Sequence, residues 1–138
     1  MTAPQHVAAP IAGARKLLLV MSDLLFRSKI DEVARRLGLE LRVAKSPEQL
    51  DRQLAAGEPS LAIVDLEETA LDSFAAIARI RSASPATPVL GFAGHGNVEA
   101  IKRARESGAT VLARSGFTAQ LPELLTQVAN RERAHFTE

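Results

Sequence analysis

Cysteine, tryptophan and tyrosine are absent from the 138-residue sequence, and five phenylalanines are its only aromatic side chains. Without cysteine, disulfides, thiolate nucleophiles and cysteine-ligated metals are excluded. The scarcity of aromatic rings leaves little surface on which single-stranded nucleic acid could stack. The 17 basic and 16 acidic side chains nearly cancel. Charge therefore favours neither a nucleic acid nor a membrane surface as the main partner.

Other signals that would place the chain in a special class are also missing. The three histidines (His6, His95 and His135) stand far apart, and none has a second ligand three or four residues away. This spacing predicts no metal site. The longest apolar run, residues 17–21, is far too short to span a membrane, and the N-terminus lacks the pattern of a secretory signal. We therefore expect a cytoplasmic protein with one compact domain and no metal.

Short apolar runs alternate with helical patterns along most of the chain. The runs that predict strands span residues 16–21, 39–44, 61–66, 88–93 and 109–113. The first and third are nearly continuous, as in parallel strands buried on both faces, whereas the second alternates like an edge strand. Residues 1–14 have no such pattern and predict a disordered tail. The expected domain spans 15–134, followed by a short tail at 135–138.

Helix start and stop signals fill the gaps between these runs. Ser46, Asn97 and Thr118 are the expected N-caps, and Gly38 and Gly108 the expected helix stops. The third helix is expected at about 72–81. Two sets of residues are expected to point inward: Val98, Ile101 and Ala104 in the fourth helix, and Leu121, Leu124, Leu125 and Val128 in the last, with Pro122 in its first turn.

This alternation predicts an α/β domain, a parallel sheet with helices on both faces and a flavodoxin-like arrangement. Functional groups in such sheets lie at the carboxyl ends of the strands. Asp65 ends the third strand. A carboxylate there serves as a nucleophile, a metal ligand or a phosphate acceptor, or else only caps a helix or lies in a loop. Its position alone does not decide between these roles.

From about Lys16 to Val128, the order and spacing of motifs resemble a bacterial response-regulator receiver domain of the CheY-like type. The matching motifs are Asp65 at the phosphoacceptor position, Asp72 opening the third helix, Pro88-Val89 before the fourth strand, GHGNVEAIKRARESGA at 94–109 and VLARSGF at 111–117. The resemblance implies a flavodoxin-like (βα)5 sandwich of three layers. It also implies a five-stranded parallel sheet with the order 2-1-3-4-5.

The sequence departs from the receiver pattern around the expected pocket. Met21 and Ser22 align with the family's acidic pair, and Asp23 matches a less constrained third position. A thioether and a neutral hydroxyl are poor Mg²⁺ ligands, because Mg²⁺ prefers hard, charged oxygen atoms. Ala93 stands where the family has a hydroxyl residue, and Arg114 where it has a lysine. Position 111, aromatic in the family, carries Val111.

These departures favour a stand-alone, degenerate receiver (a pseudo-receiver) that binds another protein without phosphorylation and without catalytic turnover. The resemblance suggests a histidine kinase or a signalling scaffold as the partner, or a homodimer through the fourth helix, fifth strand and fifth helix. Lys102, Arg103 and Arg105 on the fourth helix are the candidate interface residues. We expect no cofactor, no nucleic acid and no membrane contact.

Two alternatives stay open. A genuine single-domain response regulator would be phosphorylated on Asp65 and would recruit Mg²⁺ through a register shift of Asp23. A small flavodoxin-like enzyme or ligand-binding domain would use the crevice at the strand ends. That reading lacks a phosphate-binding glycine loop, a nucleophile motif and a second acid beside Asp65 in the expected register.

Overall fold

The computed structural model describes residues 15–130. The expected tails at 1–14 and 135–138, and the last expected domain residues 131–134, lie outside this range. Five strands alternate with five helices. In chain order they are β1 (Lys16–Val20), α1 (Leu24–Arg36), β2 (Glu40–Ala44), α2 (Pro47–Ala55), β3 (Leu61–Asp65), α3 (Ser73–Ala83), β4 (Val89–Ala93), α4 (Val98–Glu106), β5 (Thr110–Ala113) and α5 (Arg114–Ala129).

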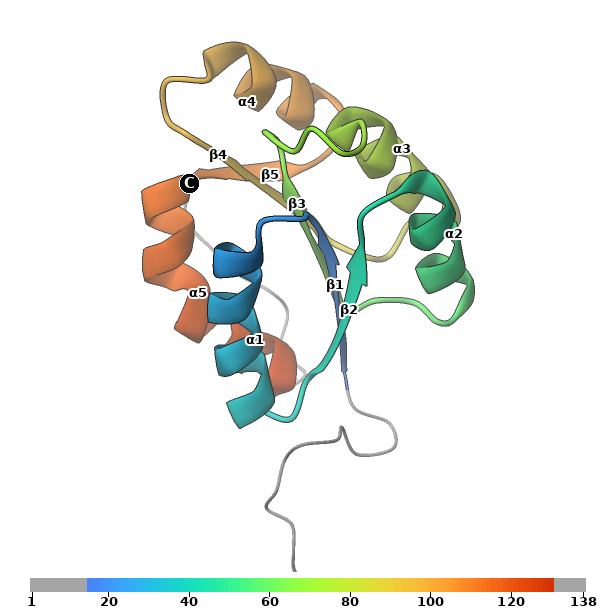
Figure 1. Cartoon of the computed structure of the whole chain (residues 1–138), viewed down its shortest axis with the longest axis vertical. Helices are drawn as coiled ribbons and strands as arrows, with labels where there is room; N and C mark the ends of the chain where they lie inside the picture. The colour runs from blue at the N-terminus through green and yellow to red at the C-terminus, as the bar shows by residue number, and fades with distance from the viewer. Residues whose placement is uncertain (1–14, 131–138) are drawn as a thin grey trace, which may run out of the picture.

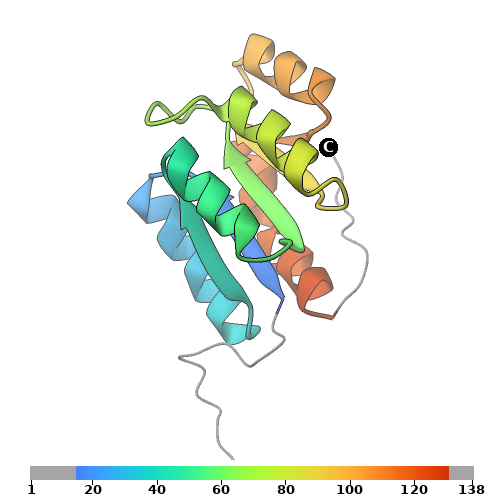
Figure 2. The same cartoon turned by 90° about the vertical axis from the view of Figure 1, so that its right-hand side faces the viewer.

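All strand pairings in the sheet are parallel, and the strand order is β2-β1-β3-β4-β5. Helices α1 and α5 cover one face, and α2, α3 and α4 cover the other (Figures 1 and 2). The predicted flavodoxin-like fold and strand order are thus confirmed. As predicted, β2 is an edge strand and is only partly buried, whereas β3 is buried throughout. No helix within 15–130 is long and apolar enough to cross a membrane.

Each face of the sheet has its own apolar core. The core under α1 and α5 contains three phenylalanine rings, from Phe26, Phe92 and Phe117. The ring centroids of Phe92 lie 4.8 Å from those of both other rings, and Phe92 and Phe117 are stacked. This cluster lies directly beneath Arg114, whose guanidinium carbon is 5.0 Å from the Phe92 centroid. It therefore forms an apolar floor under the carboxyl ends of β4 and β5.

Side chains cap four of the helices. The Ser46 and Asn97 side chains accept hydrogen bonds from backbone N–H groups of α2 and α4, which confirms both predicted caps. Asp23 and Asp72 cap α1 and α3 in the same way. Gly38 and Gly108 follow α1 and α4 with φ of 74° and 98°, a backbone region that favours glycine. The loops at both ends of the sheet are thereby fixed.

Two predictions about helices were wrong. Helix α5 begins at Arg114 and not at Thr118, so Pro122 lies inside the helix. Phe117 is fully buried and extends the apolar stripe of α5 by one turn, and the Thr118 hydroxyl donates to the Arg114 carbonyl. Val98, predicted to point inward, is 70% exposed because it is the first residue of α4 and projects beyond the core.

Candidate functional site

Asp65 is the last residue of β3, and only 6% of its surface is exposed. Its Oδ1 accepts a hydrogen bond from the Glu67 N–H at 2.9 Å, and its backbone carbonyl accepts one from the Ser73 hydroxyl at 2.7 Å. The Arg114 Nη2 is 3.8 Å from Oδ1. Burial raises the pKa of Asp65, and the Glu67 N–H and the Arg114 charge only partly oppose this effect. The carboxylate is thus held in place but desolvated.

Arg114 connects β5 to the site, because it follows that strand directly and opens α5. Its guanidinium lies over the rings of Phe26 and Phe92, at 5.3 and 5.0 Å from their centroids. The shortest charged contact of Arg114 is not with Asp65. Its Nη2 donates to Oε1 of Glu67 at 2.8 Å, a full ångström closer than Asp65. The Arg114 guanidinium therefore forms its closest ion pair with Glu67 and not with Asp65.

Glu67 was missed in the sequence, where it is one of two glutamates just after Asp65. Besides the contact with Arg114, its Oε2 accepts a hydrogen bond from Asn97 Nδ2 at 3.0 Å. The backbone N–H of Gly94 donates to the same carboxylate. The hydrogen bond from Asn97, followed by that from Arg114, lowers the pKa of Glu67. Glu67 thus joins the end of β3 to the β4–α4 loop and to the start of α5.

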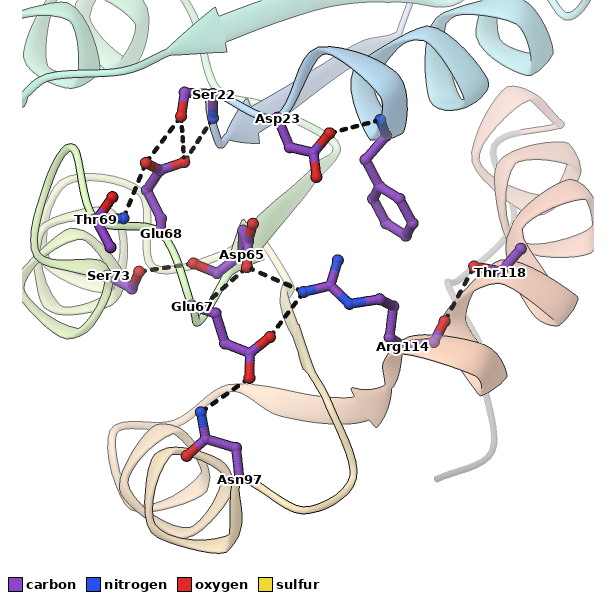
Figure 3. A network of polar contacts seen from close by, with 11 residues as sticks. Ser22, Asp23, Asp65, Glu67, Glu68, Thr69, Ser73, Asn97, Arg114 and Thr118 are labelled. Atoms are coloured by element: carbon purple, nitrogen blue, oxygen red, sulfur yellow. Dashed lines mark hydrogen bonds and ion pairs between the residues drawn. The ribbon is translucent and has the colours of Figure 1, made fainter.

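The neighbouring Glu68 turns to the opposite side of the site (Figure 3). Its carboxylate accepts hydrogen bonds from the Ser22 N–H at 2.6 Å and from the Ser22 hydroxyl at 2.9 Å. The backbone N–H groups of Thr69 and Ala70 also donate to it. Burial opposes ionisation of Glu68, but these hydrogen bonds outweigh it and lower its pKa. Ser22 is therefore a hydrogen-bond donor to a carboxylate.

Because Glu67 and Glu68 diverge, the three acids at positions 65, 67 and 68 do not converge on one point (Figure 3). Asp23 does not complete a cluster either, since it is exposed and its Oδ1 accepts from the Phe26 N–H at 3.1 Å. Within residues 15–130, no three histidine, aspartate or glutamate side chains are grouped so that they could hold a metal ion.

The other predicted pocket positions are occupied by apolar side chains. Met21, Ala93 and Val111 are buried, Met21 under α1 and α5 and the other two under the helices of the opposite face. Ala93 ends β4 without a hydroxyl. His95 is exposed in the loop between β4 and α4. Met21, Ala93 and Val111 therefore provide packing and no acid–base chemistry.

The candidate interface residues Lys102, Arg103 and Arg105 are all exposed on α4. They do not share one environment. The guanidinium of Arg103 lies 4.2 Å from the ring centroid of Phe74 on α3, so this side chain covers the α3–α4 boundary. Lys102 and Arg105, three residues apart, lie on a common flank of the helix. The structure brings none of the three into contact with Asp65.

Comparisons with known proteins agree with the geometry of the fold. No protein-family model and no curated protein sequence matches the chain. Among solved structures, a signal receiver domain of an HD domain-containing protein from Pseudomonas fluorescens Pf-5 superposes with a TM-score of 0.72. That match has 22% identity and covers 90% of this chain and 93% of the other. The chain has the receiver-domain fold.

Two further structures show the range of proteins that contain this fold. A response regulator from Burkholderia pseudomallei, solved with a phosphorylated aspartic acid, calcium and citrate, has a TM-score of 0.69 and 19% identity over 85% of this chain and 69% of its own. NtrX from Brucella abortus has a TM-score of 0.70 and 21% identity over 86% of this chain. This chain covers 28% of NtrX, so the receiver fold is one part of that longer protein.

Proposed function

We propose that this receiver-fold chain is a signalling module that binds another protein and works without phosphorylation of Asp65. The observation that carries the proposal is the direction of Glu67 and Glu68. Both carboxylates are hydrogen-bonded away from Asp65, to Arg114 and Ser22 respectively. Within residues 15–130, Asp65 and these two glutamates therefore do not form the group of acids that could hold the cation for phosphoryl transfer.

Transfer of a phosphoryl group to a carboxylate needs a divalent cation that neutralises the developing charge. Mg²⁺ takes several oxygen ligands in octahedral geometry, usually including carboxylates. Met21 and Ser22 supply no charge at the end of β1, and Asp23 is engaged as the cap of α1. Ala93 supplies no hydroxyl that could bind a transferred phosphoryl oxygen. The residues around Asp65 thus stabilise the fold and do not prepare the Asp65 carboxylate for phosphoryl transfer.

The alternative is a genuine phosphoreceiver, and Arg114 is the observation that favours it. Its Nη2 lies 3.8 Å from Asp65 Oδ1, near enough to stabilise added negative charge. Incubation with a small phosphodonor and Mg²⁺, followed by intact mass measurement, separates the two functions. We expect no adduct. One phosphoryl group that appears in the wild type and vanishes in Asp65→Asn would refute the proposal.

We place the docking surface on α4, at Lys102 and Arg105, with a histidine kinase or a scaffold as the kind of protein that the receiver fold suggests. Exposed charges at an interface mainly alter association rate and partner choice. Reversal of both residues to glutamate should weaken capture of the partner from extracts of the source cell, and more so at low salt. A matched control reverses Lys45 and Arg52, which are also exposed but lie around α2.

The outcomes of this capture experiment bear on the docking surface and on the role of Asp65. Weaker capture by the α4 variant alone supports the surface, and equal capture by all proteins across a salt series places the interface elsewhere. Asp65→Asn, tested in parallel, should capture the partner as the wild type does. Loss of capture with an intact circular dichroism spectrum would restore a role for the Asp65 carboxylate.

A further inference from the structure

The carboxylate of Glu67 lies among three hydrogen-bond donors that come from separate parts of the chain. Arg114 Nη2 donates to Oε1 at 2.8 Å from the start of α5, and Asn97 Nδ2 donates to Oε2 at 3.0 Å from the start of α4. The backbone N–H of Gly94, in the loop after β4, is the third donor. Figure 3 shows the contacts of Arg114 and Asn97 with the Glu67 carboxylate.

This donor set has the chemistry of an oxyanion-binding site. A guanidinium, a side-chain amide and a backbone N–H are the groups with which proteins bind phosphate and sulfate oxygens. A methyl group at position 94 would lie 3.6 Å from Glu67 Oε2, in ordinary van der Waals contact, so the side of Gly94 that would carry a side chain faces this carboxylate. Asp65 accepts from none of these donors, and its nearest contact with Arg114 is at 3.8 Å. The donors are therefore arranged around the anion of Glu67.

An external anion has a route to two of these residues, Gly94 and Arg114. A surface hollow of about 390 Å³ lies beside the site and includes Gly94 and Arg114 in its wall. Lys29 and His95 also line it, and its wall contains no carboxylate. A small anion in this hollow would meet positive charge and a hydrogen-bonding loop. At the site itself, the guanidinium of Arg114 is already fixed over the rings of Phe26 and Phe92.

We propose that Arg114, Asn97 and the Gly94 N–H form an oxyanion site that Glu67 fills as an internal ligand, and that inorganic phosphate binds there once this carboxylate is removed. A tethered group acts at a high effective concentration, so it competes well against free anions. The inference deepens the proposed function and rests on it, because it gives a reason why the module works without phosphorylation. While the Glu67 carboxylate occupies the oxyanion site, that site does not bind a phosphoryl group. The binding of phosphate itself does not depend on the identity of the partner.

The test is a titration of isotope-labelled protein with inorganic phosphate at constant ionic strength, followed by NMR. Glu67→Ala should give saturable shifts of the Gly94 amide, the Asn97 side-chain amide and the Arg114 Nε signal. We expect Glu67→Ala to bind phosphate at least about tenfold more tightly than the wild type does, because the competing Glu67 carboxylate is gone. Glu99→Ala removes an equally exposed carboxylate from the first turn of α4 and should behave as the wild type does.

Two further variants keep the result interpretable. Glu67→Ala combined with Arg114→Gln should lose the gained binding, and Glu67→Gln, which retains the side-chain size, should gain less than Glu67→Ala. Folding is checked in each case by the dispersion of the amide spectrum. A well-folded Glu67→Ala protein that binds phosphate no better than the wild type would overturn the inference, as would tight binding by the wild type.

Failure here is distinct from failure of the proposed function. The titration contains no phosphodonor and no partner, so it reports only on the donors around Glu67. A phosphoryl adduct on Asp65 would refute phosphorylation independence whatever the titration shows. Conversely, a negative titration leaves the partner-capture result unchanged.

Discussion

Replacement of Glu68 by alanine should destabilise the domain, because its carboxylate fastens the end of β3 to the end of β1. Ser22 donates to this carboxylate through both its N–H, at 2.6 Å, and its hydroxyl, at 2.9 Å. The N–H groups of Thr69 and Ala70 donate to it as well. Alanine removes the acceptor, so the partly buried donors of Ser22 must bind water or remain without a hydrogen bond.

The expected loss follows from the number and type of these hydrogen bonds. A hydrogen bond to a charged group contributes about 1.5–3 kcal/mol net, and partial exposure of Glu68 favours the lower end of this range. We therefore expect a decrease of about 2 kcal/mol in the free energy of unfolding, since the donors from Thr69 and Ala70 can turn to solvent. For a domain of this size, that corresponds to a drop in Tm of roughly 8 °C. Glu68→Gln keeps an acceptor but no charge and should lose about half as much.

Urea unfolding followed by circular dichroism measures the effect, with Glu32→Ala as the matched control. Glu32 is an exposed glutamate in α1 whose side chain makes no hydrogen bond or ion pair with the described residues, and its removal should change stability by no more than about 0.5 kcal/mol. The pKa of Glu68 is lowered in the folded protein, so the unfolded chain binds more protons below the ordinary value of 4.5. The difference in the free energy of unfolding between wild type and Glu68→Ala should therefore be largest above pH 4.5 and should decrease as the pH falls. Equal midpoints for the two alanine variants at neutral pH would refute this reasoning.

Other substitutions test the rest of the site. Asp65→Asn should raise the urea midpoint at neutral pH, because burial raises the pKa of Asp65 and makes its ionised form unfavourable in the folded protein. This gain in stability should vanish as the pH falls through the pKa of Asp65 in the folded protein. A loss of stability at neutral pH would contradict the prediction. Phe117→Ala should lower the free energy of unfolding by about 3–5 kcal/mol in the same assay, since it removes a fully buried ring that stacks on Phe92, and a loss below about 1 kcal/mol would mean that the cluster repacks. Titration of the wild type with Mg²⁺ to low millimolar concentration should give no saturable NMR shifts, and a saturable site that disappears in Asp65→Ala would show that the acids do converge on a metal.

The sheet was predictable because its strands obey local rules. Strands buried on both faces read as continuous apolar runs, and the caps Ser46 and Asn97 act on N–H groups only three residues away. The position of Asp65 followed from the same logic, since it directly ends the run at 61–65. These features depend on neighbours in the sequence, which a single chain displays.

The surroundings of Asp65 were less predictable because they depend on distant residues. Glu67 and Arg114 are 47 residues apart, and the pattern of the β3–α3 loop does not say which way a glutamate will turn. The start of α5 was missed for a related reason. The expected cap, Thr118, looks as suitable as the true start at Arg114 until the burial of Phe117 in the ring cluster is known. The one available signal was the pair of glutamates that begins two residues after the aspartate at the end of the strand.

The divergence of Glu67 and Glu68 has a consequence for motion at the rim of the sheet. Two consecutive residues bind the β1–α1 loop on one side and the starts of α4 and α5 on the other. None of these segments can then open without breaking contacts to the short stretch between β3 and α3. Amide hydrogen exchange would report this as one cooperative unit, in which protection at Ser22 and Gly94 is lost together although the two lie in different loops.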